Sequence, residues 1–211
     1  MEQNHNLKTK NNPQEQRFPK QNPKLRHHNN KHKPKINESD HEFYFFKLNE
    51  AKRFFVTTSS GCEEALQDEI QELFENAELP IHTWQGSSGC YFEGSWEHGF
   101  LVNCGSMCAS RVLCVLAEVY VEDNDDLEQA LAQVNWREVM TLHKTFAVKS
   151  DIANTFVSNS MFLSLKVKDI LCDSFVKEFG ERPNVDTSNP DVLFQIRLVR
   201  NKLSVSVDTT G

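Results

Sequence analysis

Apolar and polar residues alternate with two different periods between residues 53 and 121, which predicts a first folded unit of strands and helices. Residues 53–58 are rich in aromatic and β-branched side chains, as is typical of a strand. Apolar residues then recur at helical spacing through residues 62–74, where Ser60 and Glu63 have the spacing of a capping box. The same patterns predict two strands, a helix and a last strand at residues 81–85, 89–93, 96–104 and 111–121.

The resulting order, β-α-β-β-α-β, is the ferredoxin-like arrangement of strands and helices. A second unit follows, in which the acidic run 123–126 caps a helix that continues to Val134, because carboxylates are favourable at the positive end of a helix. It also contains a short helix after Asn135-Trp136, a strand at residues 145–149 and a long helix at residues 158–179. A hairpin about Asn201 follows, with strands at residues 192–200 and 202–207. Together these elements predict an α+β fold in two units.

The long helix at residues 158–179 has a broad apolar side and one charged stripe. Lys166, Asp169, Asp173 and Lys177 are spaced by three and four residues, and we expect them to form ion pairs. Most of the helix surface is predicted to be buried in the core, with one narrow stripe exposed to water. Its apolar side consists of Leu163, Val167, Ile170, Leu171, Ser174 and Phe175.

Charge is distributed unevenly along the chain, and this narrows the choice of partners. Residues 1–41 hold nine Lys/Arg, four Asp/Glu and five His but few apolar side chains, so they are predicted to be disordered. Residues 42–141 hold five basic and eighteen acidic side chains, whereas residues 142–211 hold nine and eight. A polyanion should therefore meet the tail or the last third. The stretch 24–33 has two interpretations. It binds RNA phosphates or a metal ion loosely, or it has no specific ligand and only keeps the protein in solution.

Several classes of protein do not fit the sequence. No apolar run approaches about 18 residues and the start lacks a secretory signal, so we expect a cytoplasmic protein without a membrane span. The cysteines should then be reduced thiols. Cys104 and Cys108 are four residues apart, but a metal site needs further ligands, so buried cysteine is favoured over metal binding. No glycine-rich phosphate loop and no Cys/His pairing marks an active site. The cysteines are at positions 62, 90, 104, 108, 114 and 172.

The cations of the last third are the remaining candidates for a binding site. Lys168 lies on an otherwise apolar side of the long helix, so either it reaches water past apolar neighbours or its charge meets a phosphate. Asn159 and Ser160 open the helix, where N–H groups and an amide suit phosphate and base contacts. Phe162 is expected in the core, with base stacking as the alternative. The other cations are Lys166, Arg182, Arg197, Arg200 and Lys202.

Several segments of the chain resemble the N-terminal part of bacterial THUMP-containing rRNA guanine-N2 methyltransferases, in unbroken order over residues 53–211. The resemblance implies a ferredoxin-like unit at 43–110 and a THUMP domain at 111–211, with a THUMP start near residue 96 as the alternative, after a disordered tail at 1–42. The segments are FFVTTSSGCE at 54–63, CASRVL at 108–113, VNW at 134–136, TFAV at 145–148, NS at 159–160, KVKD at 166–169, RPNVD at 182–186, PD at 190–191 and LSVSVDTTG at 203–211.

The resemblance also implies a function. In the family, the THUMP domain helps to recruit RNA, and a Rossmann-like domain that follows moves a methyl group from S-adenosylmethionine to a guanine of large-subunit rRNA. The motifs of that domain have no counterpart in residues 1–211, so no catalytic, cofactor or metal residue is assigned, and contact with a methyltransferase domain is expected. The implied RNA-binding positions are Asn159, Lys166, Lys168, Arg182 and Asn184, to which electrostatics adds Arg197, Arg200 and Lys202.

Three functions remain open at this point. The first is an RNA-binding targeting module of such a methyltransferase, which holds large-subunit rRNA through cations gathered in the last third. The second is an enzyme that itself binds S-adenosylmethionine. The third is a protein-interaction module whose acidic residues 42–141 dock on a ribosomal protein or on a separate catalytic subunit.

Overall fold

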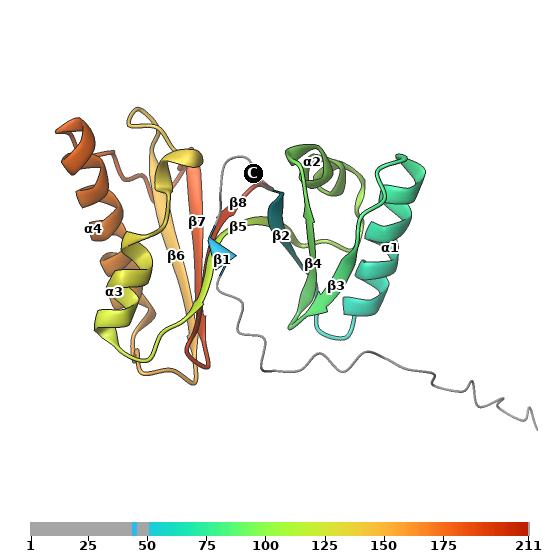
Figure 1. The fold of residues 1–211 in the computed structure, drawn as a ribbon, viewed down its shortest axis with the longest axis horizontal. Coiled ribbons are helices and arrows are strands. Elements are labelled where there is room, and N and C mark those ends of the chain that lie inside the picture. The colour runs from blue at the N-terminus through green and yellow to red at the C-terminus, as the bar shows by residue number, and fades with distance from the viewer. Residues whose placement is uncertain (1–43, 46–50, 211) are drawn as a thin grey trace, which may run out of the picture. The chain divides into compact units, whose positions relative to one another are not determined.

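The computed structural model describes residues 44–45 and 51–210. The predicted disordered tail at 1–42 lies outside the described residues. Helices are packed on a mainly antiparallel sheet, so the α+β prediction is confirmed (Figure 1). The elements are β1 (Tyr44–Phe45), β2 (Lys52–Thr57), α1 (Glu63–Asn76), β3 (Thr83–Gly86), β4 (Gly89–Gly94), α2 (Trp96–Gly105), β5 (Arg111–Tyr120), α3 (Asn124–Ala132), the 3-10 helix η1 (Trp136–Glu138), β6 (Phe146–Ala153), α4 (Ser160–Phe179), β7 (Val192–Val199) and β8 (Lys202–Asp208).

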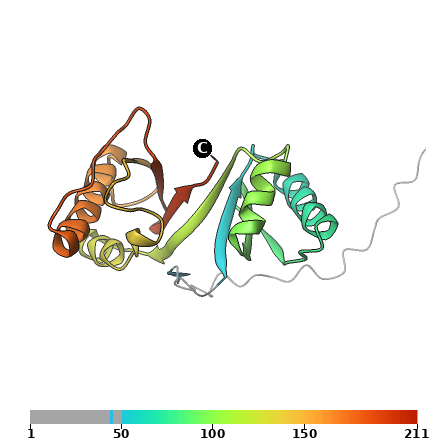
Figure 2. The same ribbon diagram turned by 90° about the horizontal axis from the view of Figure 1, so that it is seen from above.

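One sheet joins the two predicted units, with its strands in the order β3-β4-β2-β5-β8-β7-β6. Strands β6 and β7 run parallel, whereas the other neighbours on this path are antiparallel. The short strand β1 pairs with β5 outside this path. Helix α1 packs on β3 and β4, α2 packs on β4 and β5, and α4 packs on β6 with α3 next to it (Figures 1 and 2). The pair β5 and β8 therefore connects the sequence-distant halves of the chain.

The first unit is held together by aromatic rings between α1 and the sheet. Leu66, Ile70 and Phe74 recur at four-residue spacing on α1 and are fully buried. The rings of Phe54 and Phe92 stack at 4.9 Å between centroids, and Phe74 meets Phe92 edge-on at 5.1 Å. Because each buried aromatic side chain removes much apolar surface from water, these rings anchor α1 to β2 and β4.

The start of α1 differs from the predicted capping box. The residue that precedes the helix is Cys62 and not Ser60, and it makes no side-chain capping bond. Glu63 instead accepts a hydrogen bond from the backbone N–H of Gly61 at 2.8 Å. Gly61 has a φ of 90°, a left-handed conformation that glycine adopts without a steric cost, so the chain turns later than the spacing predicted.

The second unit buries alternate residues of β7 beneath α4. Val192, Phe194, Ile196 and Leu198 belong to the core. On α4 the buried positions are Leu163, Val167, Leu171, Cys172 and Phe175, which confirms most of the predicted apolar side. Asp123 caps α3 by accepting hydrogen bonds from two backbone N–H groups, so the helix begins at Asn124, earlier than predicted.

The solvent-exposed side of α4 is wider and more apolar than the narrow exposed stripe that was predicted. Met161, Phe162, Leu165, Val176 and Phe179 are all exposed large hydrophobic residues. The predicted assignment of Phe162 to the core is wrong, because its side chain lies at the exposed start of the helix and remains 48% accessible. The helix thus buries one side and leaves an apolar side in contact with water.

The two turns that frame this unit follow from backbone conformation. Gly180 ends α4 with a φ of 74°, as predicted for a glycine after a helix. Arg200 and Asn201 both have positive φ, at 50° and 63°, which is the geometry of the tight turn that joins antiparallel strands. The hairpin predicted about Asn201 is confirmed, with β7 and β8 in register.

Candidate functional site

The eight predicted RNA-binding residues lie in different places and do not form one patch. Asn159, Lys166, Lys168 and Arg182 lie on or beside α4, and Arg200 lies in the β7–β8 turn. The backbone N–H of Arg200 donates to Ala153 at the end of β6, which is the end of the sheet that leads into α4. The other three are separate: Asn184 lies beside the first residue of β6, and Arg197 and Lys202 lie on the sheet face opposite the helices.

The surface along α4 combines polar groups with exposed apolar side chains. Asn159 precedes the helix, and its side-chain oxygen accepts a hydrogen bond from the backbone N–H of Met161 at 2.8 Å. Met161, Phe162 and Leu165 are 69%, 48% and 50% exposed. Water contact with three neighbouring large apolar side chains is costly, which indicates a surface that binds a partner. We call this the α4 surface, defined by Asn159, Met161, Phe162, Leu165, Lys166, Lys168 and Arg182.

Lys166 lies between an aromatic ring and a carboxylate. Its Nζ is 2.8 Å from Oε1 of Glu128 on α3 and 5.6 Å from the centre of the Phe162 ring. Glu128 is 59% exposed, whereas the Lys166 side chain is only 13% exposed, so the carboxylate meets water while the lysine is packed against its neighbours. The predicted charged stripe within α4 is therefore replaced, for this lysine, by a pair between two helices.

Lys168 and Arg182 share one exposed carboxylate. Oδ1 of Asp169 is 2.8 Å from Nζ of Lys168 and 3.2 Å from Nη2 of Arg182. The hydrogen bond from Lys168 and the charge of Arg182 lower the pKa of Asp169, which keeps it ionised. Two cations thus meet one carboxylate, and an arriving phosphate can replace the exposed Asp169 oxygens at little cost. The structure brings these two predicted residues together.

Asn184 is remote from the start of α4. Its backbone carbonyl accepts a hydrogen bond from the N–H of Phe146, at the first residue of β6. Asn159 follows the other end of that strand, and an eight-residue strand spans about 25 Å. The two asparagines that the resemblance placed in one site therefore lie at opposite ends of β6.

Arg197 and Lys202 belong to a network on the sheet face opposite the helices. Lys202 Nζ is 3.4 Å from Oε1 of Glu118, whose side chain is 4% exposed. The same carboxylate accepts a hydrogen bond from the Tyr91 hydroxyl at 2.9 Å and lies 3.4 Å from Nη1 of Arg53. Strand alternation explains the separation, because Arg197 lies between Ile196 and Leu198, which point to the core. Lys202 thus has a structural partner that sequence reasoning missed.

Burial keeps the Tyr91 hydroxyl protonated in this network. Desolvation, followed by the charge of Glu118, raises the pKa of Tyr91 far above its usual value, so the hydroxyl stays a donor to the carboxylate. Arg197 reaches the Ser87 carbonyl at 3.5 Å from the same side. Two cations and a phenol hydroxyl therefore face one buried carboxylate, an arrangement that connects β2 and β4 with β5 and β8.

The cysteines follow the prediction only in part. Cys90, Cys114 and Cys172 are buried, and burial raises the pKa of the Cys90 and Cys114 thiols to about 12. Cys104 and Cys108 are exposed, so the expectation that this pair is buried is wrong. In the described part of the chain, no three His, Cys, Asp or Glu side chains gather as metal ligands. No helix there combines the length and apolar character needed to cross a membrane.

The two halves of the fold match two known domain families. Residues 53–113 match the RlmL ferredoxin-like domain, and residues 121–208 match the THUMP domain. The chain therefore belongs to the class of proteins that join a ferredoxin-like domain to a THUMP RNA-binding module. The predicted type of each domain is confirmed, whereas the boundary between the two domains near residue 110 stays a prediction.

Curated relatives specify the family within this class. The chain is 33% identical over 159 residues to the ribosomal RNA large subunit methyltransferase K/L of Syntrophotalea carbinolica, a match that covers 75% of this chain and 22% of the relative. The protein of the same name from Psychromonas ingrahamii is 35% identical over 159 residues, or 75% of this chain and 20% of the relative. The chain is homologous to the N-terminal part of these methyltransferases, and it spans about a fifth of the relatives' length.

Solved structures share the fold at low sequence identity. A possible methylase from Clostridium difficile 630 superposes with a TM-score of 0.65 at 18% identity, covering 76% of this chain and 42% of that chain. TrmN from Thermus thermophilus gives a TM-score of 0.57 at 18% identity, covering 76% and 46%. The arrangement of the two units therefore recurs in longer proteins.

Proposed function

We propose that this chain is the RNA-binding targeting module of an S-adenosylmethionine-dependent large-subunit rRNA guanine-N2 methyltransferase, and that the α4 surface is its RNA contact. The observation that carries the proposal is the grouping of Lys166, Lys168 and Arg182 with exposed apolar side chains along α4 within a THUMP domain. The name of the K/L relatives supports large-subunit rRNA as the target.

The residues of the α4 surface suit an RNA with unpaired bases. Lys168 and Arg182 offer charges to phosphates, which would displace the exposed Asp169. Phe162 offers a half-exposed ring on which a base can stack, next to the ammonium of Lys166. Because Asp169 is exposed, exchanging this carboxylate for a phosphate costs little desolvation.

Methyl transfer is assigned to polypeptide other than the residues described. In the proposed enzyme, S-adenosylmethionine supplies the methyl group, and this chain selects and holds the RNA. None of its residues is given a part in the chemical step. The network around Glu118 serves to hold the ferredoxin-like and THUMP halves together and not to bind RNA.

The direct test is RNA binding by charge-reversed variants. We expect wild-type chain to bind a large-subunit rRNA transcript with an affinity that falls steeply with salt, because bound phosphates release counterions. Lys168→Glu with Arg182→Glu should weaken binding by about a hundredfold at low salt and reduce the salt slope by about two.

The matched control has the same net charge as the variant with Lys168→Glu and Arg182→Glu. Arg137→Glu with Lys149→Glu also replaces two cations by carboxylates, but at positions in η1 and β6 that are not part of the α4 surface. Fluorescence anisotropy should show at most a few-fold loss for this pair. Equal losses for both pairs would mean that total charge, and not the α4 surface, governs RNA binding.

A further inference from the structure

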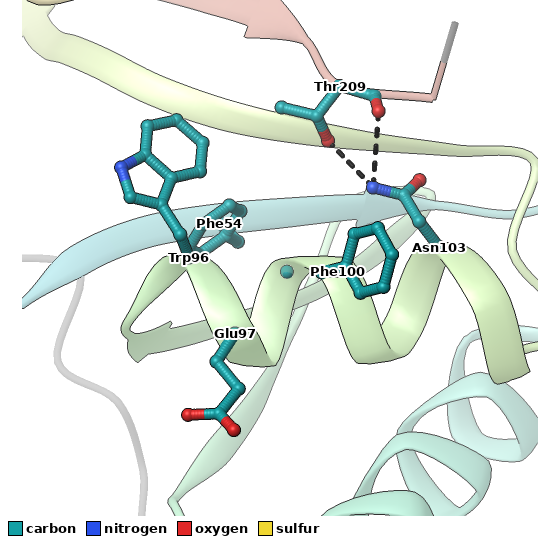
Figure 3. Close-up of a pocket in the computed structure, with 7 residues that line it drawn as sticks. Phe54, Trp96, Glu97, Phe100, Asn103 and Thr209 are labelled. Atoms are coloured by element: carbon teal, nitrogen blue, oxygen red, sulfur yellow. Dashed lines mark hydrogen bonds between the residues drawn. The ribbon is translucent and has the colours of Figure 1, made fainter.

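A second exposed apolar surface lies on α2, in the ferredoxin-like half. Trp96 is 45% exposed and Phe100 is 71% exposed. With Gly99 and Asn103 they occupy positions three and four residues apart, so they share one side of the helix. This side borders an open groove of about 400 Å³, which Figure 3 shows with the Phe100 ring standing at its edge.

The floor of the groove is rigid. The Phe54 ring is fully buried and meets the Trp96 ring edge-on at 5.7 Å. Gly99 brings α2 close to this ring, since a Cβ at that position would lie 2.6 Å from Phe54. The groove is therefore already formed without a bound partner, which reduces the entropy cost of binding.

The other wall comes from the end of the described chain. Asn103 Nδ2 donates to the carbonyl and hydroxyl oxygens of Thr209 at 3.2 and 3.0 Å (Figure 3). The backbone N–H of Thr209 donates to the Val112 carbonyl at 3.0 Å, and the Thr210 hydroxyl accepts from the Val112 N–H at 2.8 Å. Residues 209 and 210 are thus fixed between α2 and β5, at the wall of the groove.

We propose that the α2 groove is a docking surface for the methyltransferase part that the K/L relatives carry beyond the region matched here. In those relatives about four-fifths of the polypeptide lies outside the match. A polypeptide that continues beyond residue 210 starts at the groove wall, which places its apolar residues at a high effective concentration next to Trp96 and Phe100. The inference rests on the targeting role proposed above, and its test scores RNA binding separately.

The chemistry of the groove fits a protein and not a nucleic acid. Its lining is Phe54, Trp96, Glu97, Gly99, Phe100, Asn103 and Thr209, and the charged member of this set is an acid. Phosphates would meet no cation among these lining residues, the nearby Lys52 ammonium lies 5.6 Å from the centre of the Trp96 ring, and residues 42–141 as a whole are strongly acidic. Exposed Trp and Phe side chains next to a preformed groove are typical anchor residues of protein interfaces.

The test uses two exposed aromatic residues as each other's control. The probe is the Syntrophotalea carbinolica relative without its matched region, used once a cooperative thermal unfolding transition has shown that it is folded, and titrated against the full 211-residue chain by calorimetry. We expect Phe100→Glu to weaken binding of this probe at least tenfold, whereas Phe162→Glu on α4 should change it less than twofold. Binding of a large-subunit rRNA transcript should show the reverse pattern.

Each outcome decides the proposal. Absence of binding between wild-type chain and the probe, or equal binding by Phe100→Glu, would overturn it. Loss of RNA binding by Phe100→Glu, with an unchanged circular dichroism spectrum, would make the groove an RNA surface and also overturn it. Failure of wild type to bind RNA, with selective loss of the probe by Phe100→Glu, would refute the RNA role and leave the docking surface standing.

Discussion

Glu118 illustrates how a single side chain joins the two halves of the sheet. It stands on β5, and its buried carboxylate receives Tyr91 and Arg53 from the ferredoxin-like half and Lys202 from the THUMP half. A buried carboxylate without such partners would be strongly unfavourable. The residue therefore makes the two domains one structural unit at this point of the sheet.

Removing this carboxylate should be costly. We expect Glu118→Ala to lower the free energy of unfolding by roughly 3 kcal/mol, because it leaves buried cationic and hydroxyl groups without their partner. Urea denaturation measures the change. The control is Glu93→Ala, which removes a 42% exposed partner of the same Arg53 and should cost about 0.5 kcal/mol. Similar losses for the two variants would show that Glu118 does not hold the halves together.

At the scale of single elements, α2 depends on the absence of a side chain at Gly99. A Cβ there would lie 2.6 Å from a Phe54 ring that is itself held by the Phe92 ring. A glycine inside a helix otherwise costs about 1 kcal/mol relative to alanine. Close packing of α2 on β2 outweighs this cost.

Gly99→Ala should therefore destabilise the fold despite its better helix propensity. We expect a loss of about 2 kcal/mol, from overpacking against a ring that cannot move. Gly105→Ala is the comparison, because its Cβ would meet only the flexible end of Leu73 at 2.9 Å. Thermal unfolding should give a clearly smaller change for Gly105→Ala, and the opposite ranking would contradict the packing described for α2.

Most elements could be predicted from the sequence because their signals are local. The helical spacing in α1 and α4, the acidic cap of α3 and the turn at Asn201 each depend on a few consecutive residues. The capping box at Ser60 failed because Gly61 moved the turn, and the core assignment of Phe162 failed because spacing does not tell which side of a helix meets the sheet.

The candidate site was less predictable because it depends on pairing between distant strands. Asn184 was included because of the resemblance, and Arg197 and Lys202 were added because of their charge. Strand alternation directs Arg197 away from α4, and the parallel pairing of β6 with β7 places Asn184 at the far end of the sheet from Asn159. The Lys168 and Arg182 pair was correctly brought together because both lie beside Asp169.

At the scale of the whole molecule, two exposed apolar surfaces serve two proposed partners. The α4 surface carries cations and lies in the THUMP domain, whereas the α2 groove carries an acid and lies in the ferredoxin-like domain. Since the K/L relatives are about five times longer than the match, a module with one side for RNA and another for the methyltransferase part fits their size. The separation of the two surfaces lets both partners bind at once.

The most direct test of this division is to locate the RNA on the protein. Ultraviolet crosslinking of the wild-type chain to a large-subunit rRNA transcript, followed by mass spectrometry, identifies the peptides in contact. We predict crosslinks within residues 159–168 and at Arg182, with Phe162 as the main aromatic site. Crosslinks confined to residues 1–42 or to residues 53–113 would contradict the assignment of RNA binding to the α4 surface.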